Sequence, residues 1–557
     1  MKHLFRHWAY AFIAVFALLA TLMTLSPRQA LANTTAQSSP LVTPAWLETQ
    51  RTKGDILLID ASPSQLYAAK HIAGAISVDV FSFGGRNLSP AEMEPILQSW
   101  GTSTDKRIVI YDQGGAIMAT SLFYDLHYYR FPLVNLFVLD GGLSKWQAVG
   151  GAVTNEATPT PPRGNFRVTK VREEMRVRLP EFMTASGDPT NNALVDALDA
   201  SYHVGATKFF DRAGHIPNAI SLPSEELFNA DKTFKSPAEI KRMLDYLGIK
   251  PEQQVHSHCG GGMAASVPYF AMKFMLGYPN VKLYKESQLE WLKDERGLPF
   301  WTYAAPNLAR DKQWVDGWNA QMLRAFGVSK FSIIDVRSPD AFQLGHVPFA
   351  RNIPAESFKS NLSNPTKLAE LLGSAGVDVT QEVVIISDGG LSPASALAFL
   401  TLEKMGQKKV SVLFSSMDDW GLSGLPLTKP ASTAAPVAGS APPRPQSRTN
   451  YPVTTRPGVV VGHTKAAAGT FPRVYVAAGK TAPQRIENGK VIHVPYTSLL
   501  NADGKPKPAK EIWALLDKAG VPRYAEIVCI GDDTDEAAVN YFIFKLMGYP
   551  DVKVLAS

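Results

Sequence analysis

The chain has 557 residues, of which 45% are hydrophobic and 19% are charged, as is typical of a folded globular protein and too apolar for a disordered one. At about 150 residues per domain, this length predicts three or four domains. The net charge is only +6, and Lys2, Arg6 and Arg28 contribute half of it, which argues against a nucleic-acid-binding protein with a broad basic surface. The two cysteines, Cys259 and Cys529, exclude a disulfide scaffold and a cysteine-rich metal site.

Residues 1–32 have the pattern of a secretory signal peptide. A basic start precedes an uncharged apolar run from Trp8 to Leu25, and the small residues of Ala30-Leu31-Ala32 predict cleavage before Asn33. An uncleaved membrane anchor is the alternative, because the run is just long enough to cross a bilayer. We expect a periplasmic or secreted protein that has no membrane contact after cleavage and lies in an oxidising compartment.

One pattern recurs four times in the rest of the chain. Each copy has a β-rich run, a turn with a histidine near Gly or Pro, a second β run closed by a tight loop, a helical stretch and a third β run. Residues 276–282 (LGYPNVK) and 547–553 (MGYPDVK) are nearly identical copies of one phrase. Such internal similarity indicates a repeated structural unit. The copies, called units 1 to 4 below, span residues 41–153, 174–303, 308–428 and 459–557.

Within each unit, short β-branched strands alternate with amphipathic helices. This order predicts βαβ crossovers and a mostly parallel sheet covered on both faces, so the expected fold class is α/β. Residues 429–458, between units 3 and 4, are rich in Pro, Ala and Ser. They cannot form a packed core and predict an extended tether.

The tight loop after the second β run differs among the units. Its first position is Asp112 in unit 1, Cys259 in unit 2, Asp388 in unit 3 and Gly531 in unit 4. Only unit 2 therefore has a nucleophile at this position. Cys529 lies two positions earlier in its own unit, among apolar strand residues, and we expect it to be a buried structural cysteine.

Three glycines follow Cys259. Gly260-Gly261-Gly262 lets the backbone turn its N–H groups inward and form a concave anion-binding site, and the predicted helix behind it, which extends to Phe274, adds positive potential. We expect these features to favour the Cys259 thiolate, or a persulfide on its sulfur. The alternative is a simple strand-to-helix turn with an inert buried cysteine.

On these residues the chain resembles the rhodanese family of sulfurtransferases. The resemblance rests on the Gly214-His215-Ile216-Pro217 turn, the Cys259 loop, and the Leu139-Asp140-Gly141-Gly142 segment with Trp146. It implies four rhodanese-like domains, each a mostly parallel five-stranded sheet flanked by helices. Unit 2 would be catalytic, units 1 and 3 inactive and unit 4 degenerate.

By the same resemblance, Cys259 is the sulfur carrier. It would take a sulfane sulfur from a small donor and pass it to a thiol, to a cyanide-like acceptor or to a protein. The loop is more similar to that of 3-mercaptopyruvate sulfurtransferases than to that of thiosulfate-preferring members, which usually carry Arg and Lys after the cysteine, but both donors stay open. The amides expected to cradle the persulfide are those of Gly260, Gly261, Gly262, Met263 and Ala264.

The family's substrate-binding Asp-x-Arg motif reads Asp196-Ala197-Leu198 here. Arg212 and Lys208 are the nearest candidate cations for an anionic donor, although each could be a solvated loop residue instead. Alternation along the strand places His258 on the face opposite Cys259, which argues against a Cys–His pair. The resemblance implies that unit 1 packs on unit 2 and places Cys259 at their interface, and it requires no metal or organic cofactor.

Two other functions can be compared with the sequence. A non-catalytic binding or scaffold protein fits the three units that lack the cysteine, but it gives no reason to keep Cys259 in a glycine loop. A phosphatase of the Cys-x5-Arg type needs an arginine to bind the phosphate oxygens. That position is Ala265, which excludes this chemistry.

Overall fold

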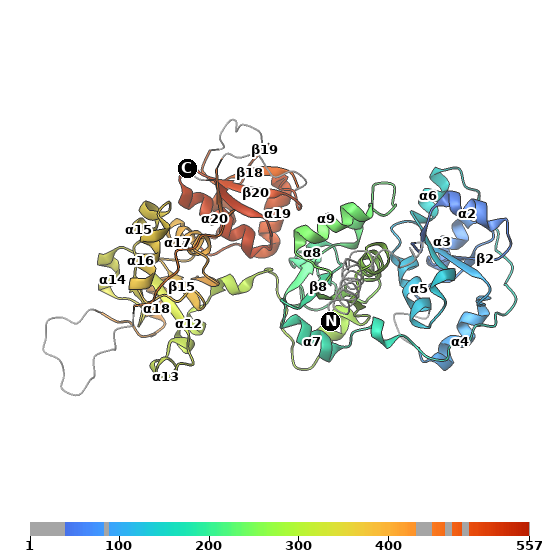
Figure 1. The fold of residues 1–557 in the computed structure, drawn as a ribbon, viewed down its shortest axis with the longest axis horizontal. Helices are drawn as coiled ribbons and strands as arrows, with labels where there is room; N and C mark the ends of the chain where they lie inside the picture. The colour runs from blue at the N-terminus through green and yellow to red at the C-terminus, as the bar shows by residue number, and fades with distance from the viewer. Residues whose placement is uncertain (1–38, 83–87, 430–447, 463–470, 482–489, 556–557) are drawn as a thin grey trace, which may run out of the picture.

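The computed structural model of the protein describes residues 39–82, 88–429, 448–462, 471–481 and 490–555 (Figure 1). The predicted signal segment 1–32 and most of the tether 429–458 lie outside these residues. No helix in the described part of the chain is long and apolar enough to span a membrane.

Within the described residues, four parallel sheets follow one strand order, one sheet for each unit. In unit 1 the order is β1 (Leu41–Val42), β6 (Leu136–Leu139), β5 (Arg107–Tyr111), β2 (Ile56–Asp60) and β4 (Ile76–Ser77). In unit 3 it is β12 (Ala309–Arg310), β16 (Lys409–Leu413), β15 (Glu382–Ile386), β13 (Phe331–Asp335) and β14 (Arg351–Asn352). In unit 4 it is β17 (Val460–Val461), β21 (Val552–Leu555), β20 (Glu526–Ile530), β18 (Arg473–Ala477) and β19 (Lys490–His493).

The sheet of unit 2 differs from the expected five strands. Its described strands are β11 (Val281–Leu283), β10 (Gln254–His258), β8 (Asn192–Asp196) and β9 (Ala219–Ser221). The fifth strand is reduced to a single bridge between Arg176 and Leu283. The reason is local, because a 3-10 turn ends at Met175 and helix α7 already begins at Leu179, which leaves no length for a strand.

Helices cover both faces of these sheets. In unit 1 they are α2 (Pro44–Arg51), α3 (Ser64–Ala69), α4 (Pro90–Ser99), α5 (Ile117–Tyr128) and α6 (Gly142–Ala148). In unit 2 they are α7 (Leu179–Ser186), α8 (Ala200–His203), α9 (Pro237–Leu247), α10 (Ser266–Phe270) with the π-helical turn Ala271–Met275, and α11 (Ser287–Lys293). In unit 3 they are α12 (Lys312–Asn319), α13 (Gln321–Ala325), α14 (Pro339–Leu344), α15 (Ala355–Asn361), α16 (Pro365–Ser374), α17 (Pro393–Lys404) and α18 (Met417–Leu422). Unit 4 has α19 (Ala509–Ala519) and α20 (Thr534–Leu546).

The described units associate in two pairs, unit 1 with unit 2 and unit 3 with unit 4 (Figure 1). Each pair has one continuous apolar core, built around the helix that follows the tight loop of each unit. Phe123 on α5 packs edge-on against Phe270 on α10, with ring centroids 5.0 Å apart, and Phe399 on α17 packs against Phe542 on α20 at 4.8 Å. Because the loops lead directly into these helices, each loop lies beside the partner unit.

Candidate active site at the Cys259 loop

The Cys259 loop is held in place by its own backbone and by the segment after β11. The Cys259 amide donates to the Ser287 hydroxyl at 3.0 Å, and the Cys259 carbonyl accepts from Gln288 N at 3.1 Å. Gly262 has φ +88°, and a Cβ at this position would overlap the Lys285 carbonyl oxygen. Only glycine therefore fits this turn.

Cys259 Sγ accepts a hydrogen bond from Gly262 N at 3.1 Å, so the loop turns an amide toward the sulfur as expected. Amides of Gly261 and Ala265 also act on the thiol in the direction that lowers its pKa. Of the five residues expected to cradle a persulfide, the structure thus brings Gly261 and Gly262 to the sulfur, and it adds Ala265, which the sequence did not indicate.

The loop amides act as expected, but the expectation that the site as a whole favours the Cys259 thiolate is wrong. Cys259 is only 3% exposed, and its burial raises the pKa of the thiol by more than the loop amides lower it. Desolvation disfavours a charged sulfur, and this penalty exceeds the contribution of the three amides. A bound ligand or a persulfide would change that balance.

A cavity of about 370 Å³ adjoins the sulfur. Unit 1 lines it with Val80, Phe81, Ile117, Ser121 and Asp125, and unit 2 lines it with Leu198, Phe209, Cys259, Gly260, Gly261, Met263, Ala264 and Lys285. The structure therefore confirms that Cys259 lies between the two units. Apart from the Lys285 and Asp125 side chains and the Ser121 hydroxyl, the side chains around the sulfur are apolar.

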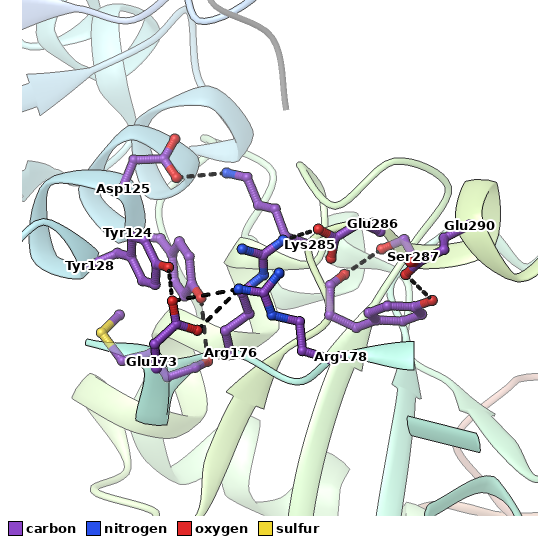
Figure 2. Close-up of polar contacts among 12 residues, drawn as sticks. Tyr124, Asp125, Tyr128, Glu173, Arg176, Arg178, Lys285, Glu286, Ser287 and Glu290 are labelled. Atoms are coloured by element: carbon purple, nitrogen blue, oxygen red, sulfur yellow. Dashed lines mark hydrogen bonds and ion pairs between the residues drawn. The ribbon is translucent and has the colours of Figure 1, made fainter. Parts of the chain in front are cut away.

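Lys285 and Asp125 form a buried ion pair across this interface. Lys285 Nζ lies 2.8 Å from Asp125 Oδ1, and the two side chains are 4% and 9% exposed. Figure 2 shows Lys285 extending from unit 2 toward Asp125 on α5 of unit 1. Neither residue is among the candidates predicted from the sequence. One signal was available, because the position of Lys285 is Asp140 in unit 1 and Phe414 in unit 3.

More charged groups lie next to this pair, along a groove of about 980 Å³ that also contacts Gly261 and Lys285. Most of them are already bonded to one another. Arg176 is bonded to Glu286, and Glu173 accepts from both the Tyr128 hydroxyl at 2.7 Å and the Arg178 guanidinium at 3.2 Å (Figure 2). These pairs give the groove a mixed rather than a positive charge.

Arg212 does not lie where a residue that binds an anionic donor beside Cys259 would be expected. Its guanidinium donates to the Leu298 carbonyl at 2.8 Å and lies over the Phe300 ring, and it is not among the described residues that line the Cys259 cavity. Lys208 is exposed and is also not part of that lining. Leu198, which stands where the family motif has arginine, does line the cavity, as an apolar group.

His258 faces away from the sulfur, as strand alternation predicted. Its ring contacts Phe182 at a centroid distance of 5.2 Å in the core on the other face of the sheet, whereas Cys259 belongs to the core shared with unit 1. Burial lowers the pKa of His258 to about 4, so the imidazole is neutral near neutral pH. Cys529 is fully buried in β20, as expected.

The corresponding loops of units 1 and 3 are engaged by other groups of the protein. The Asp112 carboxylate accepts from the amides of Gly114, Met118 and Ala119 at 2.9, 3.0 and 3.2 Å. In unit 3 the backbone of Gly504, from unit 4, fills the space beside Gly390. No group of three or more potential metal-ligating residues occurs among the described residues.

A comparison with protein families matches units 1 to 3. The rhodanese-like domain model matches residues 43–149, 181–294 and 317–423, more than half of the chain. "Probable 3-mercaptopyruvate sulfurtransferase" of Pseudomonas aeruginosa is 29% identical over 46% of this chain and 97% of its own length. "Thiosulfate sulfurtransferase" of the same organism is 28% identical over 45% and 93%. The crystal structure of SseA from Escherichia coli aligns at 25% identity and a TM-score of 0.41, over 45% of this chain and 99% of SseA. The chain belongs to the rhodanese-like domain family.

Proposed function

We propose that this protein moves a sulfane sulfur from a small donor, thiosulfate or 3-mercaptopyruvate, to a thiophilic acceptor through a persulfide on Cys259. Its enzyme class is that of its curated relatives, sulfurtransferase. The observation that carries the proposal is Cys259 itself, which combines a sulfur bonded to a loop amide with an adjacent cavity of about 370 Å³. A purely non-catalytic scaffold would need neither feature.

The first half of the reaction loads the sulfur. The Cys259 thiolate attacks the sulfane sulfur of the donor and forms a new S–S bond. The electron pair of the broken bond leaves with sulfite when the donor is thiosulfate, or with the enolate of pyruvate, which then takes up a proton, when the donor is 3-mercaptopyruvate. In both cases the outer sulfur stays on Cys259 as a persulfide.

The second half returns the enzyme to its starting state. A thiolate or cyanide attacks the outer sulfur, and the bond to Cys259 Sγ breaks, so the acceptor leaves as a persulfide or thiocyanate and the Cys259 thiolate is regenerated. The amides of Gly261, Gly262 and Ala265 would stabilise negative charge on either sulfur. The amides would contribute most when Cys259 is a thiolate or a persulfide anion, because the resting thiol is mostly protonated.

Two further parts of the proposal concern the rest of the chain. Residues 1–32 would direct export and then be cleaved, which rests on the sequence pattern alone. Unit 4 would be a divergent rhodanese-like domain, which is supported by its strand order, the same as in units 1 and 3.

Intact-protein mass spectrometry tests the proposal. The reduced mature protein is incubated with thiosulfate or with 3-mercaptopyruvate, beside the variants Cys259→Ser and Cys529→Ser. We expect the wild type and Cys529→Ser to gain the mass of one sulfur atom, which cyanide removes, and we expect no gain in Cys259→Ser. A gain in Cys259→Ser, or no gain in any of the proteins, would refute the carrier role.

A further inference from the structure

We infer that Asp125, a residue of the cysteine-less unit 1, sets the charge of the sulfur donor that the Cys259 cavity accepts, because it holds Lys285 in an ion pair. The inference rests on the proposed sulfur transfer and specifies its donor class. It assigns unit 1 a direct part in substrate selection: the cavity would favour donors with a single negative charge or none over a dianion such as thiosulfate.

Positive charge is scarce around the Cys259 cavity. Lys285 is the one cationic side chain among the described residues that line the cavity. Leu198 occupies the place of the family's arginine, and Arg212 is engaged with the Leu298 carbonyl. A doubly charged donor that enters this cavity loses its hydration, and beside the loop amides it meets Lys285 as the one cationic side chain of the described lining.

The charge of Lys285 is already compensated. Asp125 Oδ1 lies 2.8 Å from the ammonium nitrogen, and both side chains are almost fully buried, so water screens the pair weakly. The pair is neutral as a whole. A neutral pair gives a donor little net compensation, and the cost of removing a donor from water grows steeply with its charge, so a dianion loses more than a monoanion.

The segment that carries Lys285 lies against the Cys259 loop. The Lys285 carbonyl packs directly against Gly262, whose amide donates to Cys259 Sγ. The segment that carries the ion pair is thus in contact with the loop that holds the reacting sulfur. Asp125 reaches the cavity from α5, the helix that packs on α10 behind that loop. Lys285 and Asp125 therefore both lie close to the place where the sulfane sulfur of a donor must approach Cys259.

The test compares persulfide formation from thiosulfate and from 3-mercaptopyruvate, at equal concentrations, in the wild type, Asp125→Asn and a matched control. The control is Asp140→Asn, because Asp140 is also an interface carboxylate, accepting from Phe234 N at 2.8 Å, but does not line the cavity. We expect Asp125→Asn to raise the thiosulfate-to-mercaptopyruvate ratio of loading rates about tenfold or more. The control should leave the ratio unchanged, and the double variant Asp125→Asn/Lys285→Met should abolish the gain.

The outcomes separate the inference from the function on which it rests. An unchanged ratio in Asp125→Asn, with the persulfide still formed, would overturn the inference and leave the sulfur transfer intact. No persulfide in the wild type with either donor would overturn both. The wild type gives a second readout that needs no variant: 3-mercaptopyruvate should load Cys259 faster than thiosulfate, and faster loading by thiosulfate would contradict the role of the ion pair.

Discussion

The loops of units 1 and 2 have a similar backbone, but a different side chain accepts the loop amides in each. In unit 1 the Asp112 carboxylate accepts three backbone amides of its own loop and of the helix that follows, so the anion-binding site is filled by the protein itself. In unit 2 the smaller, uncharged thiol of Cys259 accepts from Gly262 and lies beside a cavity. The comparison indicates that the loop directs amides toward its first residue in both units, a carboxylate in unit 1 and a thiol in unit 2.

The loop of unit 3 is engaged by a segment of unit 4. The loop at Asp388 meets the backbone of unit 4, where Leu391 N donates to the Gly504 carbonyl at 2.9 Å and Gly390 packs against Gly504. A partner segment here replaces the internal carboxylate contacts of unit 1. In both cases the fold is kept and the loop is engaged by other groups of the protein.

The largest effect should come from Gly262→Ala, which breaks the loop of unit 2. Its φ of +88° disfavours any side chain, and the new Cβ would overlap the Lys285 carbonyl, so the amide at Sγ must move. We expect the rate of sulfur transfer to fall about a hundredfold or more, in line with the loss of an anion-stabilising donor. The matched control is Gly261→Ala, where a Cβ meets nothing within 4 Å. Equal activity of the two variants would contradict the account.

The second effect concerns the protonation of Cys259. Because burial raises the pKa of this thiol above its ordinary value, the thiolate is the minor form at neutral pH and its fraction grows with pH. We expect the rate of alkylation by a neutral reagent, measured on Cys529→Ser protein, to rise about tenfold per pH unit up to about pH 9. A rate that levels off below about pH 8 would mean that the loop amides outweigh burial.

The third effect concerns a cysteine placed in the loop of unit 1, at the position of Asp112, to test whether it can carry sulfur. In the double variant Asp112→Cys/Cys259→Ser, the amides of Gly114, Met118 and Ala119 lose their carboxylate acceptor. We expect the free energy of unfolding to fall by about 1–3 kcal/mol relative to Cys259→Ser, as measured by chemical denaturation. We also expect no sulfur to be taken up from either donor, and persulfide formation on the new cysteine would show that the residue type alone is sufficient.

The smallest effect is expected for Arg212→Ala. Since this guanidinium donates to the Leu298 carbonyl and does not line the described cavity, its removal should change kcat/KM for either donor by less than about twofold. Steady-state kinetics with both donors provide the measurement. A large rise in KM for the anionic donors would restore Arg212 as a substrate-binding residue.

Much of this architecture could be predicted because short segments of the sequence determine it. The alternation of β-branched runs and helices predicted the α/β class, and the cysteine with its three glycines predicted the loop and its place after a strand. Strand alternation was enough to place His258 away from Cys259. The parallel sheet of unit 2 was expected as well, but not the reduction of its fifth strand, which depends on how the 3-10 turn before Arg176 meets α7.

The features that could not be predicted depend on contacts between units. Lys285 and Asp125 are separated by 160 positions in sequence, and no pattern in either segment indicates that they meet. The direction of the Cys259 pKa shift depends on how deeply the folded protein buries the thiol, since the glycines alone suggested the opposite direction. The closure of the unit 3 loop by Gly504 likewise appears only once two units are packed together.

The most direct test of the central claim is to locate the transferred sulfur. Protein loaded with 3-mercaptopyruvate is treated with an alkylating reagent that preserves persulfides, digested, and analysed by peptide mass spectrometry. The account predicts that the peptide containing Cys259 carries the extra sulfur and that the peptide containing Cys529, which is fully buried in β20, carries none. Sulfur on Cys529, or a protein that turns over donor with Cys259 unmodified at every time point, would contradict it.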